Sequence, residues 1–357
     1  MVDLHHIITD GASSVIMIRE LAALYAGEAL PILNLQYKDF AEWQRNDEFQ
    51  FGMKEQEAWW LTQFAGEVPV LELPTDYPRP AVQTFAGDQL QFTIGKEQTR
   101  ELNAFASQEG VTLYMVLLTI FNIFLAKLSG SEDIVIGAPA EGRRHADLKY
   151  VIGMFVNTLA QRNKPRAELP YTDFLRQVQA NVLDNLENQD YPFEELVTKV
   201  EVQRDAGRNP LFDVMFTFMN VNKRDIIIPG LNLKPYPYEY GTAKFDILLS
   251  CRDTEMGREL ALGFEYSTRL FKRETIQRFT EYFKNIIAAV LTNSAQKLKD
   301  IEIITNLERE RILNQFNDTV VEYPRDKTIH QLFEEQAERI PDFIALVGAD
   351  LWRLSQN

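Results

Sequence analysis

A strongly apolar stretch at residues 112–128 restricts the folds that this chain can adopt. Asn122 and Lys127 interrupt the stretch, and a Ser-Gly-Ser sequence ends it. A helix that crosses a membrane needs about 20 apolar residues, and this stretch is short for that purpose. We therefore expect a helix that is buried in the core of a globular domain, with other elements packed around it.

Periodic patterns predict strands and helices on both sides of that helix. Alternating apolar residues predict strands at 89–94 and 260–266, and runs of strand-forming residues predict two more at 133–137 and 212–221. Residues 137–144 contain Pro139 and two glycines and are predicted to form a loop. Further helices are predicted at residues 12–25, 37–43, 53–64, 96–108, 171–188, 193–202 and 273–291. Strands mixed with long apolar helices indicate an α/β (α+β) sandwich.

The composition limits the size of the core and the kinds of partner. The chain has 357 residues, which is room for two domains or lobes, and its 45% hydrophobic content is ordinary for a globular protein. A net charge of −15 argues against nonspecific nucleic-acid binding, which needs a basic surface. The single cysteine, Cys251, excludes an internal disulfide and is expected to be a small buried apolar residue. A reducing, cytoplasmic location fits this cysteine content, and the N-terminal residues show no signal pattern.

Two of the four histidines, His5 and His6, are adjacent and precede an Asp-Gly turn. The residues around them favour a strand, in which neighbouring side chains point to opposite faces. The pair is then poorly placed to bind one metal ion, which needs convergent ligands, so no metal site is expected. One imidazole can instead face a reacting group and exchange a proton with it near neutral pH. An ordinary half-buried pair without a catalytic role is the alternative.

The whole string HHIITDG at residues 5–11 resembles the HHxxxDG motif of nonribosomal peptide synthetase condensation domains. The motif also occurs in epimerization domains and related acyltransferases. Further strings resemble motifs of the same family in the same order: YKDFAEW at 37–43 (YxDxAxW), IGMFVNT at 152–158 (IGxFVNT) with Arg162 following, DYPFE at 190–194 (HQDYPFE) and RDAGRNPL at 204–211 (RDxSRNPL). Asn188 replaces the histidine of HQDYPFE, and Gly207 replaces the serine of RDxSRNPL.

The resemblance covers about residues 1–305 and implies a V-shaped pair of chloramphenicol-acetyltransferase-like lobes with a channel between them. Residues 1–35 are then a remnant of the N-terminal lobe that carries HHxxxDG, and residues 36–305 are the C-terminal lobe. Residues 306–327 are a linker, and residues 328–357 begin a truncated adenylation domain, whose opening the string TIHQLFEEQ resembles. Because most of the N-terminal lobe is missing, we expect this chain to be inactive alone and both end segments to be loosely held.

The resemblance implies amide formation, in which the amine of a carrier-bound aminoacyl group attacks a carrier-bound peptidyl or aminoacyl thioester. Both substrates arrive on the 4′-phosphopantetheine arms of carrier domains upstream and downstream, and the chain itself binds no cofactor. An adjacent adenylation domain is the other expected partner, whereas neither nucleic acid nor a membrane is expected. Epimerization of a carrier-bound residue and a non-catalytic module that only docks carriers remain as alternatives.

The resemblance also suggests roles for the residues of the first motif. His6 is the residue nearest the attacking amine, with His5 beside it, and it either takes a proton or orients the amine. Gly11 is a candidate backbone N–H donor to the thioester oxygen. Asp10 is expected to hold the loop by an ion pair, because a buried carboxylate needs a partner. The predicted partner is Arg143, which follows a predicted strand in a Gly-Arg-Arg sequence.

Residues of the later motifs are candidates for structural or channel positions. Asn157 is the polar side chain of IGMFVNT that is predicted to line a channel. Asp190 lies in a predicted turn before a helix, with Pro192 near the first helical position. Arg204 and Arg208 belong to a loop that Asp-Arg pairing is expected to hold.

Overall fold

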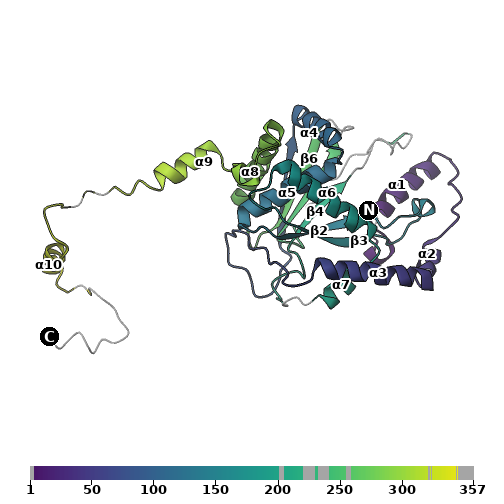
Figure 1. Ribbon diagram of the computed structural model, residues 1–357, viewed down its shortest axis with the longest axis horizontal. Coiled ribbons are helices and arrows are strands. Elements are labelled where there is room, and N and C mark those ends of the chain that lie inside the picture. Colours follow the sequence, from purple (N-terminus) through teal and green to yellow (C-terminus); the bar gives the residue numbers. More distant parts are fainter. Residues whose placement is uncertain are drawn as a thin grey trace. The chain divides into compact units, whose positions relative to one another are not determined.

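The computed structural model describes residues 4–200, 205–219, 230–231, 241–254, 259–320, 322, 324–342 and 344 of the chain. The chain divides into two compact units, Met1–Thr305 and Asn306–Asn357. The first unit contains a β-sheet with helices packed on it, and the described part of the second contains only short helices (Figure 1).

A mixed six-stranded sheet lies at the centre of the first unit, with the strand order β1-β6-β5-β4-β2-β3. Its strands are β1 (Gly87–Ile94), β2 (Ile134–Ala140), β3 (Asn157–Asn163), β4 (Val214–Met219), β5 (Ile247–Thr254) and β6 (Glu259–Ser267). Strand β4 runs parallel to β5 and, where Gly137 pairs with Met215, parallel to β2. The other neighbouring strands are antiparallel. This mixed sheet with its helices agrees with the predicted α/β (α+β) architecture.

Helices occur at every position where the sequence predicts one. In the first unit they are α1 (Gly11–Tyr25), α2 (Tyr37–Trp43), α3 (Asp47–Gln63), α4 (Lys96–Glu109), α5 (Leu113–Ser129), α6 (Tyr171–Glu187), α7 (Phe193–Lys199) and α8 (Arg273–Thr292). Short 3-10 turns are η1 (His6–Ile8), η2 (Ala146–Leu148) and η4 (Leu298–Asp300). The second unit contains α9 (Asn306–Glu310), the π-helical turn η5 (Arg311–Gln315) and α10 (Ile329–Arg339).

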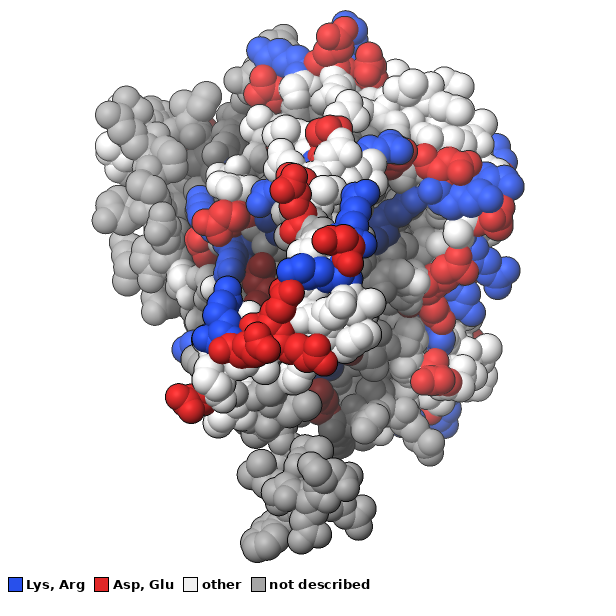
Figure 2. Space-filling view, turned by 90° about the vertical axis from the view of Figure 1, so that its left-hand side faces the viewer, with Lys and Arg blue, Asp and Glu red and all other residues white. Residues whose placement is uncertain are grey.

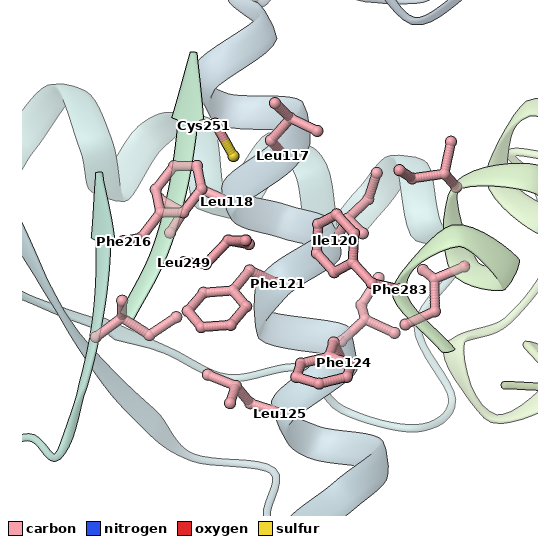
Figure 3. Packing of buried hydrophobic residues seen from close by; sticks show 14 of the residues in the cluster. Leu117, Leu118, Ile120, Phe121, Phe124, Leu125, Phe216, Leu249, Cys251 and Phe283 are labelled. Carbon is pink, nitrogen blue, oxygen red and sulfur yellow. The ribbon is translucent and has the colours of Figure 1, made fainter. Parts of the chain in front are cut away.

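Helix α5 is the buried core helix that its sequence predicts. Every side chain from Met115 to Leu125 is buried. Figure 3 shows its labelled α5 residues, among them Phe121 and Phe124, between the sheet and α8. The ring centre of Phe121 lies 6.0 Å from that of Phe216 in β4, and the ring centre of Phe124 lies 6.0 Å from that of Phe283 in α8. Apolar contacts on both sides explain why the helix has no polar face.

The ends of α5 are set by local chemistry. The hydroxyl of Thr112 accepts a hydrogen bond from the Met115 N–H at 3.3 Å, and Gly130 ends the helix with a φ of 72°. Among the described residues, no single helix is long and apolar enough to span a membrane; only the bent pair α4 and α5 passes such a test, on length and composition alone. Cys251 is buried near α5, as predicted, and its burial raises the pKa of the thiol.

The opposite face of the sheet is covered at its β2–β3 end by a second apolar cluster. Ile134 and Ile136 of β2 face the α5 core, whereas Val135 between them faces this second cluster. There it is grouped with Trp60 of α3 and Leu196 of α7. Helices α3 and α7 are thereby placed close to the segment that follows β2.

Two strand predictions need correction. Residues 137–144 were predicted as a loop, but β2 continues to Ala140 because its backbone pairs with β3. Gly137 does not end the strand, since it marks the close approach of Phe212: a Cβ atom at Gly137 would lie 2.2 Å from that ring. Strands β3 and β5 were not predicted, because the pairing of β3 with β2 and of β5 with β4 and β6 depends on other segments of the chain.

We expect the backbone amides of α1 to exchange with solvent faster than those of α5. Only Ser13, Ile16 and Ala22 of α1 are buried, whereas α5 is buried over three turns. Hydrogen exchange measured by mass spectrometry should show rates at least about tenfold apart, with α8 as a second slow reference, because a difference of about 1.4 kcal/mol in opening free energy is tenfold. Equal protection of α1 and α5 would contradict the expected loose attachment of residues 1–35.

Candidate active site

The two histidines lie in an exposed turn, and the predicted strand around them is wrong for the residues described. His5 is extended, with φ −66° and ψ 135°, and His6 begins the turn η1. The Nδ1 atom of His5 accepts a hydrogen bond from the Ile7 N–H at 3.1 Å. A strand needs a neighbouring strand to satisfy its backbone, and no described strand pairs with this segment. The backbone therefore bonds locally, from the Ile8 N–H to the His5 carbonyl at 3.1 Å.

Asp10 and Arg143 form the ion pair that the sequence predicts. The Arg143 guanidinium donates to both carboxylate oxygens of Asp10, at 2.8 and 3.0 Å. The side chains are only 4% and 2% exposed, so the pair is buried in a bidentate geometry. Arg143 reaches Asp10 from the segment after β2, and its guanidinium carbon lies 4.4 Å from the centre of the Phe155 ring.

Two backbone groups complete the surroundings of Asp10. Asp10 caps α1 by accepting from the Ser13 N–H at 2.8 Å, and its other oxygen accepts from the Phe155 N–H at 3.1 Å. Burial acts to raise the pKa of Asp10, but the hydrogen bonds from Arg143, Ser13 and Phe155 outweigh it and lower the pKa to about 2. Asp10 is therefore a permanent carboxylate that anchors the chain and does not exchange protons near neutral pH.

The other residues of the first motif stay on the surface. The His6 side chain is exposed, and no hydrogen bond joins its ring to another described residue. Gly11 is the exposed first residue of α1, and a Cβ atom there would meet nothing within 4 Å. A backbone N–H at a helix N-terminus can bind negative charge, so the role of Gly11 as a donor to the thioester oxygen stays a prediction.

Asn157 uses its amide group to hold a turn. Its Nδ2 donates to the carbonyls of Gln189 and Tyr191, at 2.8 and 2.7 Å. The Oδ1 of Asn157 accepts from the Thr158 N–H at 2.8 Å, so the side chain acts as both donor and acceptor to backbone groups. Asp190 lies inside this turn and accepts from Arg144 at 2.6 Å. A channel position for Asn157 stays a prediction.

Replacing Asn157 by alanine is expected to destabilise the fold by roughly 1–3 kcal/mol, because two buried or half-buried carbonyls lose their donor. Asn188→Ala is a matched control, since the exposed Asn188 amide bonds only to the Asp184 carbonyl within its own helix turn. The control should change stability by no more than about 0.5 kcal/mol. Urea unfolding followed by circular dichroism measures both, and equal effects would contradict the role of Asn157.

Arg208 lies in a cluster of opposite charges. Its guanidinium donates to Asp213 at 2.7 Å, to Glu72 at 2.5 Å and to the Leu71 carbonyl at 3.2 Å. Asp205 lies 3.7 Å from the Nε of Arg208. These contacts tie the loop after residue 204 to the segment before β1. Arg204 itself lies outside the described residues.

A cavity of about 450 Å³ is lined by Gly142 and Arg144, the two residues on either side of Arg143. Segments that are distant in the sequence meet there, since YKDFAEW contributes Asp39, Phe40 and Trp43. The full lining is Leu35, Asp39, Phe40, Trp43, Gly142, Arg144, His145, Leu148 and Asp190. His6 is not among the lining residues, so this cavity alone is no reaction site for the histidine.

The contacts of Ser13, Tyr37 and Gly153 join segments that are distant in the sequence, and no short-range pattern predicts them. Ser13 lies in the first turn of the helix predicted at residues 12–25, and its side chain is fully buried with its Oγ in contact with Gly153. A glycine inside an apolar segment is a signal for close backbone approach, and Gly153 is such a residue.

The surface carries mixed charge. Figure 2 shows Lys and Arg interspersed with Asp and Glu on the face that it presents. Such a face offers no continuous basic surface for a phosphate backbone. Among the described residues there is also no group of three His, Cys, Asp or Glu side chains that is placed to hold a metal ion.

Solved structures share this fold. A four-domain nonribosomal peptide synthetase bound to AMP and glycine matches with a TM-score of 0.80 and 22% identity, over 95% of this chain and 27% of that one. The condensation domain from Monacolin K polyketide synthase matches with a TM-score of 0.72 and 19% identity, over 82% of this chain and 69% of that one. The first unit therefore has the chloramphenicol-acetyltransferase-like α/β fold of condensation domains.

Sequence comparisons give the family. Tyrocidine synthase 3 of Brevibacillus parabrevis is 49% identical over 350 residues, 98% of this chain and 5% of that protein. Surfactin synthase subunit 1 of Bacillus subtilis is 46% identical over 340 residues, 95% of this chain and 9% of that protein. The chain thus spans less than a tenth of the length of these relatives. Residues 1–313 match the family model described as condensation domain, and the chain therefore belongs to the condensation-domain family, the amide-forming acyltransferase domains of nonribosomal peptide synthetases.

Proposed function

We propose that this chain provides the catalytic motif of a domain that joins a carrier-bound peptidyl or aminoacyl thioester to a carrier-bound aminoacyl amine. The observation that carries the proposal is the buried Asp10–Arg143 pair, because it anchors the chain directly after the exposed histidine turn. The family match over residues 1–313 gives the reaction class.

In the proposed reaction, the amine nitrogen attacks the thioester carbonyl carbon, a C–N bond forms and the C–S bond breaks. The acyl group moves to the acceptor, and the donor arm leaves as a thiol. An ammonium group must first lose one proton, which the His6 imidazole can accept and release to solvent. After the attack the nitrogen loses a second proton, which His6 can accept and pass to the leaving sulfur. His6 is favoured over His5 because the His5 ring is already bonded to the Ile7 N–H. Orientation of the amine by His6 contributes to the same step.

The substrates in this proposal are attached to 4′-phosphopantetheine arms, on which condensation domains act. The arms belong to carrier domains upstream and downstream. An adenylation domain is the proposed neighbour on the C-terminal side, because residues 328–336 resemble the opening of one. The 49% identical relative also aligns over 350 residues, which is more than the 313 residues of the family match. The chain itself needs no bound cofactor for this reaction.

We further propose that residues 1–35 belong to an N-terminal lobe and residues 36–305 to the C-terminal lobe of a V-shaped domain. Two observations support this division. The described part of residues 1–35 adds no strand to the six-stranded sheet. Helix α1 also exposes an apolar face formed by Ile18, Leu21 and Tyr25, which are 39%, 58% and 60% exposed. An exposed apolar helix face is typical of a surface that another element covers.

A peptide-bond assay with two loaded carriers tests the proposal. The full-length protein that contains this chain is mixed with an aminoacyl donor carrier and an aminoacyl acceptor carrier, and the acceptor arm is analysed by mass spectrometry. A dipeptidyl acceptor supports amide formation. Chiral chromatography of the donor residue released from its carrier and a carrier-binding measurement complete the assay. A donor residue of inverted configuration without a dipeptide indicates epimerization, and carrier binding without either product indicates a docking module; both results would contradict the proposal.

A further inference from the structure

Ser13 is bonded to its full capacity by two distant segments. Its Oγ donates to the Gly153 carbonyl at 2.8 Å and accepts from the Gly153 N–H at 3.0 Å. It also accepts from Arg143 at 2.9 Å. A hydroxyl has one donor and two acceptor positions, so all three are used. The side chain is fully buried, and the start of α1 is thereby fixed to the IGMFVNT segment.

Tyr37 holds the same backbone from the other side. Its hydroxyl donates to the Met154 carbonyl at 2.9 Å, and its ring packs edge-on at 5.0 Å against Phe155. A Cβ atom at Gly153 would lie 2.1 Å from the Tyr37 ring, so the ring lies directly on the backbone and only glycine fits there. The Tyr37 ring and the Gly153 backbone are therefore in close contact, although 116 positions separate the two residues in the sequence (153 minus 37).

These contacts surround the anchor of the histidine turn. Asp10 accepts from the Phe155 N–H, one residue beyond the carbonyl that Tyr37 holds. Asp10 and the preceding Thr9 are buried, and the Thr9 N–H bonds to the His6 carbonyl at 3.4 Å. If residues 153–155 move, Asp10 is therefore expected to move with them and to shift the turn that carries His6.

We propose that Ser13 and Tyr37 are positioning residues, which clamp the backbone of Gly153–Phe155 between them and so fix where His6 stands. The proposal rests on the proposed function, because it assigns these residues to the geometry of the same reaction. It gives the tyrosine of YKDFAEW a role beyond helix packing. A reacting group that is misplaced by about 1 Å can cost about a hundredfold in rate, so the clamp has a kinetic consequence.

Gly153→Ala is the sharpest test, because the new methyl group must push the Tyr37 ring or the backbone aside. In the full-length protein, kcat for dipeptide formation should fall about a hundredfold. The KM for the loaded acceptor carrier should stay within about twofold, since the carrier surface is unchanged. Gly52→Ala is the matched control: a Cβ atom there meets nothing within 4 Å, and kcat should be unchanged.

A double variant separates positioning from simple destabilisation. Tyr37→Ala removes the ring that the new methyl group would strike, so Gly153→Ala should cause little further loss in that background. Independent effects would instead multiply. Tyr37→Phe removes only the hydroxyl and should lower kcat by roughly twofold to tenfold at unchanged KM, and it keeps the test open if Gly153→Ala does not fold.

Unchanged kcat in Tyr37→Phe, or multiplying losses in the double variant, would overturn the clamp. A rise in KM as large as the expected fall in kcat, with kcat itself unchanged, would also overturn the clamp. Failure of the proposed function gives a different result, because the unmutated protein would then form no dipeptide at all.

Discussion

Replacing His6 by alanine is expected to lower the rate of dipeptide formation by about 10²–10⁴-fold, the usual contribution of a positioned acid–base group. The His6 ring is exposed and no hydrogen bond joins it to another described residue, so the variant should unfold at the same temperature as the unmutated protein. Single-turnover measurement with saturating loaded carriers isolates the chemical step, and thermal unfolding provides the folding control.

His5→Asn is the matched comparison for His6→Ala. The ring of His5 caps the turn by accepting from the Ile7 N–H, and an asparagine oxygen can accept the same bond. His5→Asn should therefore keep most of the activity, whereas His6→Ala should not. Turnover like that of the unmutated protein in His6→Ala, or a greater loss in His5→Asn, would show that the catalytic histidine is misassigned.

Replacing Asp10 by alanine is expected to destabilise the fold by roughly 3–5 kcal/mol, because it leaves the Arg143 guanidinium buried without its partner. Two further groups, the Ser13 and Phe155 N–H groups, lose an acceptor. Arg144→Ala is the control, since the Arg144 side chain is half exposed and its pair with Asp190 should contribute no more than about 1 kcal/mol. Urea unfolding measures both variants, and similar small losses would contradict the anchor role.

The same carboxylate predicts how stability depends on pH. The pKa of Asp10 is lowered to about 2 in the folded protein, so the unfolded chain binds a proton at this position at higher pH than the folded one. Its contribution, about 2 kcal/mol, is complete above about pH 4 and is lost as the pH falls towards 2. The stability difference between the unmutated protein and Asp10→Asn should therefore shrink over this window. A constant difference from pH 5 to about pH 2 would contradict the lowered pKa.

Sequence reasoning predicted the features that depend on neighbouring residues. The apolar stretch that became α5 has no polar face, and burial on all sides is the only environment that satisfies it. Helix positions follow from the 3.6-residue period, and α6 and α8 begin at the predicted residues. The Asp10–Arg143 pair was also predictable, because a buried carboxylate needs a partner and the Gly-Arg-Arg sequence follows a predicted strand.

Features that depend on long-range pairing were not predicted. Strand β5 is a strand because β4 and β6 supply hydrogen bonds on both sides, and the extra length of β2 comes from β3. The segment of His5 and His6 has strand-forming residues but no described strand beside it, so it forms a turn. Strand propensity is weak without a partner, and the partner is chosen by the tertiary fold.

The sequence by itself determined the family motifs and the buried helix. Only the tertiary structure decided how those residues are held: Asn157 bonds to a turn, Arg208 joins a charge cluster, and Tyr37 lies on Gly153. The physical reason is that periodicity and capping act over a few residues, whereas a side chain meets its partner only after distant segments pack. A glycine inside an apolar segment indicates that another part of the chain approaches its backbone closely. The folded chain shows that the Tyr37 ring does so at Gly153.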